Sequence, residues 1–253
     1  MEVHHPKEVT HKKPWKEYLL EFAMLFLAVF LGFLADNYRE SRVEQQKARE
    51  YIEGLYNDLA LDTTRIQTYI AYDAEKLKNL SRLPECFHGK TFNERSRPVM
   101  LQVIRHSSIS RPYLITSRSL DQLSTTGSYR LLQQAVADSI INYTDKFESL
   151  HDFQTTIFQN TQDKIRARMT EVLSFGATVQ MFDAGKGWNM ETFPDSAIKA
   201  PLFQTQNPSQ LNAYFNELML YQRVTYYHQQ YLYGLLETQQ RLLVYLGEKY
   251  GLE

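Results

Sequence analysis

The chain has 253 residues, enough for one large or two small domains. Its 28 Lys and Arg residues nearly balance its 29 Asp and Glu residues, so the composition offers no basic surface and we expect no nucleic-acid partner. The single cysteine, Cys86, excludes an internal disulfide and cannot by itself build a zinc site. We expect a buried thiol, with an intermolecular link as the alternative.

Residues 1–16 carry lysines and histidines without apolar periodicity and are interpreted as a mobile basic leader. The apolar run that follows, Tyr18 to Ala35, is interrupted by one charged residue, Glu21. At a helical rise of ~1.5 Å per residue it nearly spans the roughly 30 Å of a bilayer's hydrocarbon core. We therefore predict that residues 17–36 form a single transmembrane helix in a lipid bilayer.

Residues with a polar tip flank this run. Trp15, Lys16 and Tyr18 lie at its start and Tyr38 at its end, where membrane-interface anchors are expected. Basic residues are similarly frequent on both sides, so orientation rests on the tendency of a short basic leader to stay in the cytoplasm. This favours the inner (cytoplasmic) membrane with a periplasmic C-terminal domain.

Three other interpretations of the run are weaker. A cleaved signal peptide needs small residues before the cut, and Phe33 and Leu34 beside Ala35 do not supply them. A buried core helix fits the shortness of Phe22 to Ala35, but that stretch is apolar on every face. For the same reason an interfacial amphipathic helix, which needs a polar face, is disfavoured.

One face of the predicted span differs from the others. Glu21, Ala28, Gly32 and Ala35 fall on one side of a helix and combine a carboxyl group with small residues. Small residues let a second helix approach closely, and a carboxyl group prefers protein to lipid. We expect a contact with another membrane protein or a second copy of this chain, unless Glu21 simply lies near the headgroups.

Residues 37–253 are predicted to form a helical bundle domain. Apolar residues recur at three-, four- or seven-residue steps up to about Leu83, where Pro84 ends the first helix. Charged residues are expected on the other faces of this helix, namely Glu44, Lys47, Glu50, Arg65 and Lys76. Short helices are expected over Val99–His106 and, capped by Ser117 or Ser119, through Leu123.

Two further long helices are expected. The first runs from about Leu132 to Val172, and its heptad steps place Ile157 among the buried residues. A long loop then covers residues 176–208, and Ser209 caps the last helix. In that helix several tyrosines and His228 are interpreted as packing residues rather than ligands. The fold class is thus all-α, one membrane helix continuing into a bundle of three helices, or four if the segment around Leu101 joins the core.

No catalytic signature is present: His-Glu-x-x-His, Gly-x-Ser-x-Gly, a phosphate loop and paired cysteines are all lacking. We therefore expect no enzyme, no cofactor and no metal site. Three functions remain: an accessory or scaffold subunit of a cell-envelope complex, a ligand-sensing periplasmic bundle, and a proton-coupled subunit using Glu21.

Two stretches resemble a known family. The segment from Trp15 to Glu40, and Leu120 to Leu132 followed by Ile140 to Tyr143, are similar to an uncharacterised family of single-pass membrane proteins from Bacteroidota. The resemblance implies an N-terminal anchor and a Gram-negative cell envelope, and it carries over no catalytic residues.

Overall fold

The computed structural model describes residues 14–88, 91–108, 113–125, 127–184 and 194–252. Most of the predicted leader, and Trp188 in the predicted loop, lie outside these ranges. The chain divides into two compact units, residues 1–50 and 51–253, and each is described by itself.

The described residues are mainly α-helical, which confirms the predicted fold class. The α-helices are α1 (Trp15–Leu80), α2 (Arg97–Ser108), α3 (Arg118–Thr125), α4 (Gln134–Asp152), α5 (Gln159–Val172), α6 (Phe175–Ala184) and α7 (Pro208–Tyr250). Short 3₁₀ segments cover Leu83–Cys86, Glu94–Ser96, Ser128–Leu131 and Asp195–Ala197, and a π-helix covers Phe153–Phe158. Two-residue strands β1 (Phe87–His88) and β2 (Thr91–Phe92) pair antiparallel, with Phe87 opposite Phe92.

The first unit contains the N-terminal part of α1. Its most apolar 18-residue window is entirely unburied, so by length and composition this helix is able to cross a membrane. Large side chains in this window are exposed in a way that a core helix is not, for example Leu27 at 52% and Val29 at 67%.

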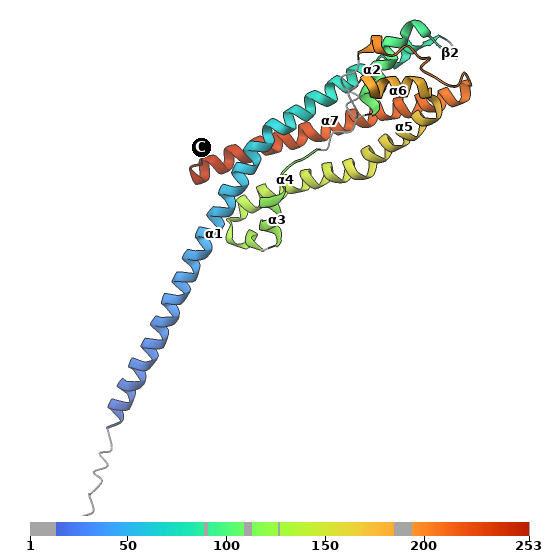
Figure 1. Ribbon diagram of the computed structural model, residues 1–253. Helices are drawn as coiled ribbons and strands as arrows, with labels where there is room; N and C mark the ends of the chain where they lie inside the picture. The colour runs from blue at the N-terminus through green and yellow to red at the C-terminus, as the bar shows by residue number, and fades with distance from the viewer. Residues whose placement is uncertain (1–13, 89–90, 109–112, 126, 185–193, 253) are drawn as a thin grey trace, which may run out of the picture. The chain divides into compact units, whose positions relative to one another are not determined.

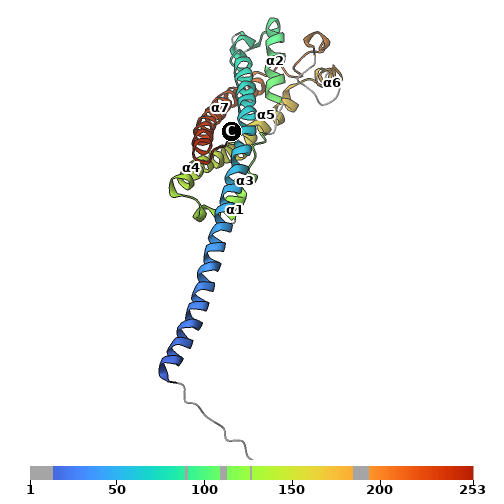
Figure 2. The same ribbon diagram turned by 90° about the vertical axis from the view of Figure 1, so that its left-hand side faces the viewer.

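The second unit is a bundle of long helical segments (Figures 1 and 2), built from α1, from α4 with α5, and from α7. Residues 51–80 of α1 lie antiparallel to α7, as shown by Gln229 Nε2 donating to the Ile70 carbonyl and Gln239 Nε2 donating to the Leu59 carbonyl. The third segment is α4 continued by the π-helix and α5, which packs along α7. Apolar residues at helical spacing on all three segments form the core, including Ile52, Ile66, Ile140 and Leu232.

The shorter helix α2 extends this core at one end of the unit. Leu101, Val103 and Ile104 are buried there in one cluster with residues of α5 and α7. The segment around Leu101 therefore joins the core, as the four-helix alternative required.

The π-helix changes the register of the second long segment. A heptad step from Leu150 reaches Ile157, yet Ile157 is 47% exposed and Phe158 is buried. A π-turn contains an additional residue, so the apolar stripe moves on by one position. The prediction that Ile157 is a core residue was wrong for this reason.

Two expected boundaries also differ. Residues 176–184, predicted to be the start of a loop, belong to α6 (Phe175–Ala184), which buries Ala177 and Met181. The last helix is capped by Asn207, whose side chain accepts a hydrogen bond from the Ser209 N–H, with Pro208 in the first helical turn. The Ser209 cap was therefore wrong by two residues.

We predict that shortening a buried side chain of α1 lowers the free energy of unfolding far more than shortening an exposed one. Leu59→Ala removes a side chain that is 2% exposed and should lower the free energy of unfolding by about 2–5 kcal/mol. Urea unfolding of the full chain in detergent, followed by circular dichroism, measures this change.

Leu61→Ala is the matched control, because Leu61 lies on the same helix and is 55% exposed. It should change stability by less than about 0.5 kcal/mol. Equal losses for the two variants would contradict the packing described.

Cys86 is buried, as expected. Burial, helped by the negative charge of Glu85, raises the pKa of its thiol to about 11.

We predict that iodoacetamide at pH 8 labels native Cys86 slowly, because little thiolate is present, and labels it rapidly once urea unfolds the chain. A Ser81→Cys variant, with an exposed thiol in the same region, should label rapidly in the native state; comparable native rates for both thiols would refute this.

Candidate functional sites

A cluster of polar side chains lies inside the bundle, which we call the Asp73 cluster: Asp73, Lys76, Tyr113, Gln154, Tyr221 and His228. Asp73 and His228 are both fully buried, and their Oδ2 and Nδ1 atoms are 2.5 Å apart. The Tyr113 hydroxyl donates to Asp73 Oδ1 at 2.9 Å. Gln154 Nε2 lies 2.9 Å from His228 Nε2. Four segments of the chain thus meet at one carboxylate and one imidazole.

The hydrogen bonds indicate which ring nitrogen of His228 faces an acceptor and which faces a donor. A carboxylate only accepts, so Nδ1 of His228 carries the proton, and Nε2 is left to accept from the Gln154 amide. This assignment matches the charge balance, because Asp73 is already offset by the ammonium group of Lys76, whose Nζ lies 3.9 Å from Oδ1. A neutral His228 leaves the cluster with no net charge.

Lys76 is enclosed by aromatic rings. Its Nζ donates to the Tyr221 hydroxyl at 2.9 Å and lies 4.7–5.2 Å from the ring centroids of Tyr72, Phe158 and Tyr221. Ring faces attract a cation, and this attraction is stronger away from water. Only 1% of the Lys76 side chain is exposed, so these rings and Asp73 replace its hydration shell.

Burial and the nearby Asp73 charge raise the pKa values of Tyr113 and Tyr221 well above the ordinary range for phenols. Both phenols therefore stay protonated: Tyr113 as a donor to Asp73, Tyr221 as an acceptor from Lys76. Within the described ranges no group of three or more His, Cys, Asp or Glu residues is arranged to hold a metal ion. The Asp73 cluster thus joins α1, α7, the π-helix and the Tyr113 stretch by hydrogen bonds around a buried ion pair, Asp73 and Lys76, that lies within α1.

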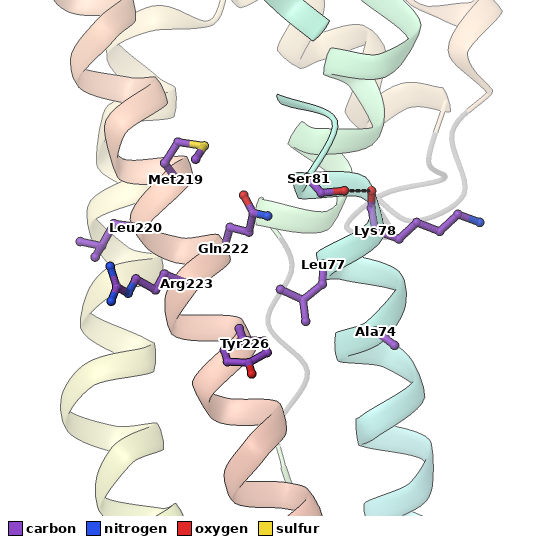
Figure 3. A pocket seen from close by; sticks show the side chains of 9 residues that line it. All are labelled: Ala74, Leu77, Lys78, Ser81, Met219, Leu220, Gln222, Arg223 and Tyr226. Atoms are coloured by element: carbon purple, nitrogen blue, oxygen red, sulfur yellow. Dashed lines mark hydrogen bonds between the residues drawn. The ribbon is translucent and has the colours of Figure 1, made fainter. Parts of the chain in front are cut away.

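A groove opens on the surface between α1 and α7, which we call the α1/α7 groove (Figure 3). Its volume is about 850 Å³, and its apolar lining includes Ala74 and Leu77 of α1 and Met219, Leu220 and Tyr226 of α7. Leu77 points from α1 toward α7, whereas Lys78 and Arg223 extend from the two outer sides. The arrangement is an apolar strip with a cation on each flank.

The residues predicted for a membrane contact lie on α1. Glu21, Ala28, Gly32 and Ala35 are all exposed, and a Cβ atom added at Gly32 would meet nothing within 4 Å. This face is therefore accessible to a second helix. The predicted interface anchors Trp15, Lys16, Tyr18 and Tyr38 are also exposed, and both sets of roles remain predictions.

The Asp73 cluster was not predicted from the sequence. Lys76 was expected on a solvent face, which was wrong, because Lys76 is buried beside Asp73. Asp73 follows Ile66 and Ile70 at steps of four and three, and this position on an apolar stripe was a usable signal. His228 is a buried packing residue, as expected, but it also bonds to Asp73.

Comparison with protein-family models, curated proteins and solved structures found no match. The functional proposals for this chain therefore rest on its own sequence and geometry.

We predict that the two charges of the Asp73 cluster depend on each other. Asp73→Asn leaves the Lys76 ammonium group uncompensated and should lower the free energy of unfolding by about 3 kcal/mol or more. The double variant Asp73→Asn, Lys76→Met should lose less than the sum of the two single losses, since neither charge remains. The free energy of unfolding is measured by urea unfolding in detergent for the unaltered chain, the two single variants and the double variant.

Asp138→Asn serves as the control, because Asp138 is an exposed carboxylate on α4 and its change should stay within about 0.5 kcal/mol. Strict additivity of the Asp73 and Lys76 losses would show that the two groups do not interact.

Proposed function

We propose that this protein is a membrane-anchored accessory or scaffold subunit of a cell-envelope complex, which binds partners through one face of its membrane helix and through the α1/α7 groove. The observation that carries the proposal is the contrast between an unburied apolar stretch at the start of α1 and a helical unit, residues 51–253, with its own core. The proposed location is the inner membrane with residues 51–253 in the periplasm. The resemblance to single-pass proteins of Bacteroidota is consistent with this.

The membrane face is proposed to contact another helix. A helix that packs against Ala28 and Gly32 approaches closely because these side chains are small, and it shields Glu21 from lipid. The occupant is a transmembrane helix of a partner protein or a second copy of this chain.

The α1/α7 groove is proposed to bind an amphipathic helix with carboxylates along both edges of its apolar stripe. Lys78 and Arg223 are exposed, and neither forms an ion pair within the described part of the chain. A helix seated between α1 and α7 buries Leu77, Met219 and Tyr226 and places acidic residues near both cations.

The anchor is tested by fractionation after expression of the full chain. Leu27→Arg with Phe30→Arg places two charges in the apolar run, at about 2.5–3.5 kcal/mol each, and should shift the protein from the carbonate-resistant membrane fraction to the soluble fraction. Leu61→Arg, on an exposed position of the 51–253 unit, is the control and should stay with the membrane. Release of the unaltered chain without detergent would refute the anchor.

The groove is tested with two designed helical peptides that share a Leu stripe, one flanked by Glu and the other by Lys. Fluorescence anisotropy should show binding of the Glu-flanked peptide to the full chain in detergent and much weaker binding of the Lys-flanked one. Lys78→Glu with Arg223→Glu should reverse this preference. Equal binding of both peptides, or a preference that the charge reversal leaves unchanged, would exclude the proposed partner chemistry.

A further inference from the structure

A second, smaller pocket lies on the bundle, and we call it the Tyr113 pocket. Its volume is about 320 Å³, near the lower limit for small-molecule sites. It is bounded by the extended stretch that contains Tyr113 and Ile115, by Asp121 of α3, and by Phe147 and His151 of α4. All of these residues belong to the 51–253 unit.

The inner wall of the Tyr113 pocket is connected to the Asp73 cluster. Tyr113 and Gln154 line the pocket, and the same two side chains bond to Asp73 and His228 at 2.9 Å each. A molecule in the pocket would therefore touch side chains that bond directly to two fully buried titratable groups. A surface depression formed by chance has no reason to share its lining with such a network.

The π-helix is an independent sign of function at this place. It begins at Phe153, next to the pocket, and supplies Gln154 to the inner wall and Phe158 to the aromatic enclosure of Lys76. A π-turn is less stable than the α-helix it interrupts, and such turns occur frequently at functional sites.

The chemistry of the pocket favours a cation with an apolar body. Asp121 is exposed, and its Oδ2 accepts from the Ser117 hydroxyl at 2.9 Å. Neither Arg118 nor any other cation among the described residues forms an ion pair with it. Phe147, Leu150 and Ile115 supply apolar walls, and an aromatic ring beside a carboxylate suits an ammonium group.

Charges of both signs flank the pocket residues along α4. Lys146 precedes Phe147, and Glu148 and Asp152 follow Phe147 and His151; all three are exposed. The preference for a positive ligand therefore rests on Asp121, the carboxylate of the pocket lining.

We infer that the Tyr113 pocket is a binding site for a small organic amine, whose ammonium group lies at Asp121 and whose apolar or aromatic body lies against Phe147 and Leu150. The inner wall of Tyr113 and Gln154 then places the bound amine next to the Asp73 cluster. This site does not depend on the scaffold function proposed above, because it uses neither the membrane face nor the α1/α7 groove.

The test uses three probes of one shape and different charge: benzylamine, benzyl alcohol and benzoate. Ligand-observed NMR on the full chain in detergent at pH 7.5 should give a Kd of about 1–10 mM for benzylamine, as expected for so small a ligand. Benzyl alcohol should bind about tenfold more weakly, and benzoate more weakly still. Because all three partition into detergent, each value is measured against micelles without protein.

Asp121→Asn should weaken benzylamine binding about tenfold and leave benzyl alcohol unchanged, since only the charge on the protein is removed. Asp138→Asn is the matched control, an exposed carboxylate of α4 that is not part of the pocket lining, and should leave both affinities unchanged. Binding of benzoate as tight as that of benzylamine would overturn the inference. So would a benzylamine affinity unaffected by Asp121→Asn, or lowered equally by Asp138→Asn.

Discussion

The buried carboxylate of Asp73 constrains how the segments of the bundle pack together. It lies on α1, receives hydrogen bonds from His228 of α7 and from Tyr113 of the link before α3, and is offset by Lys76. A charge without these partners would be very unfavourable at such burial, so the segments that supply them must meet there. Apolar packing alone tolerates a helix sliding by a turn, whereas this set of bonds accepts one register.

The Asp73 cluster also lies close to both surface depressions, the α1/α7 groove and the Tyr113 pocket. Ala74 and Leu77, which line the α1/α7 groove, alternate along α1 with the buried Asp73 and Lys76. The Tyr113 pocket shares Tyr113 and Gln154 with the cluster. A ligand or a partner helix bound at either place would therefore lie close to the group that fixes helix register.

The scaffold proposal and the amine-site proposal use different surfaces of the chain. A scaffold needs an anchor and a docking face, and these are the exposed apolar stretch of α1 and the α1/α7 groove. An amine site needs a small pocket with a carboxylate, and this is the Tyr113 pocket. Neither requires catalysis, consistent with the lack of catalytic sequence motifs.

The sequence by itself determined the helical class, the long helices and their approximate ends, because apolar periodicity and proline act locally along the chain. It also determined the apolar N-terminal stretch, since length and composition suffice for that. Tertiary structure alone decided that Lys76 is buried while Ile157 is exposed. The first depends on Asp73 and on rings contributed by α7 and the π-helix, and the second on a π-turn that shifts the register. The burial of Lys76 thus arises from contacts with segments far apart in sequence, which periodicity within one helix does not report. The exposure of Ile157 arises from one additional residue in a local turn, which a regular heptad count does not include.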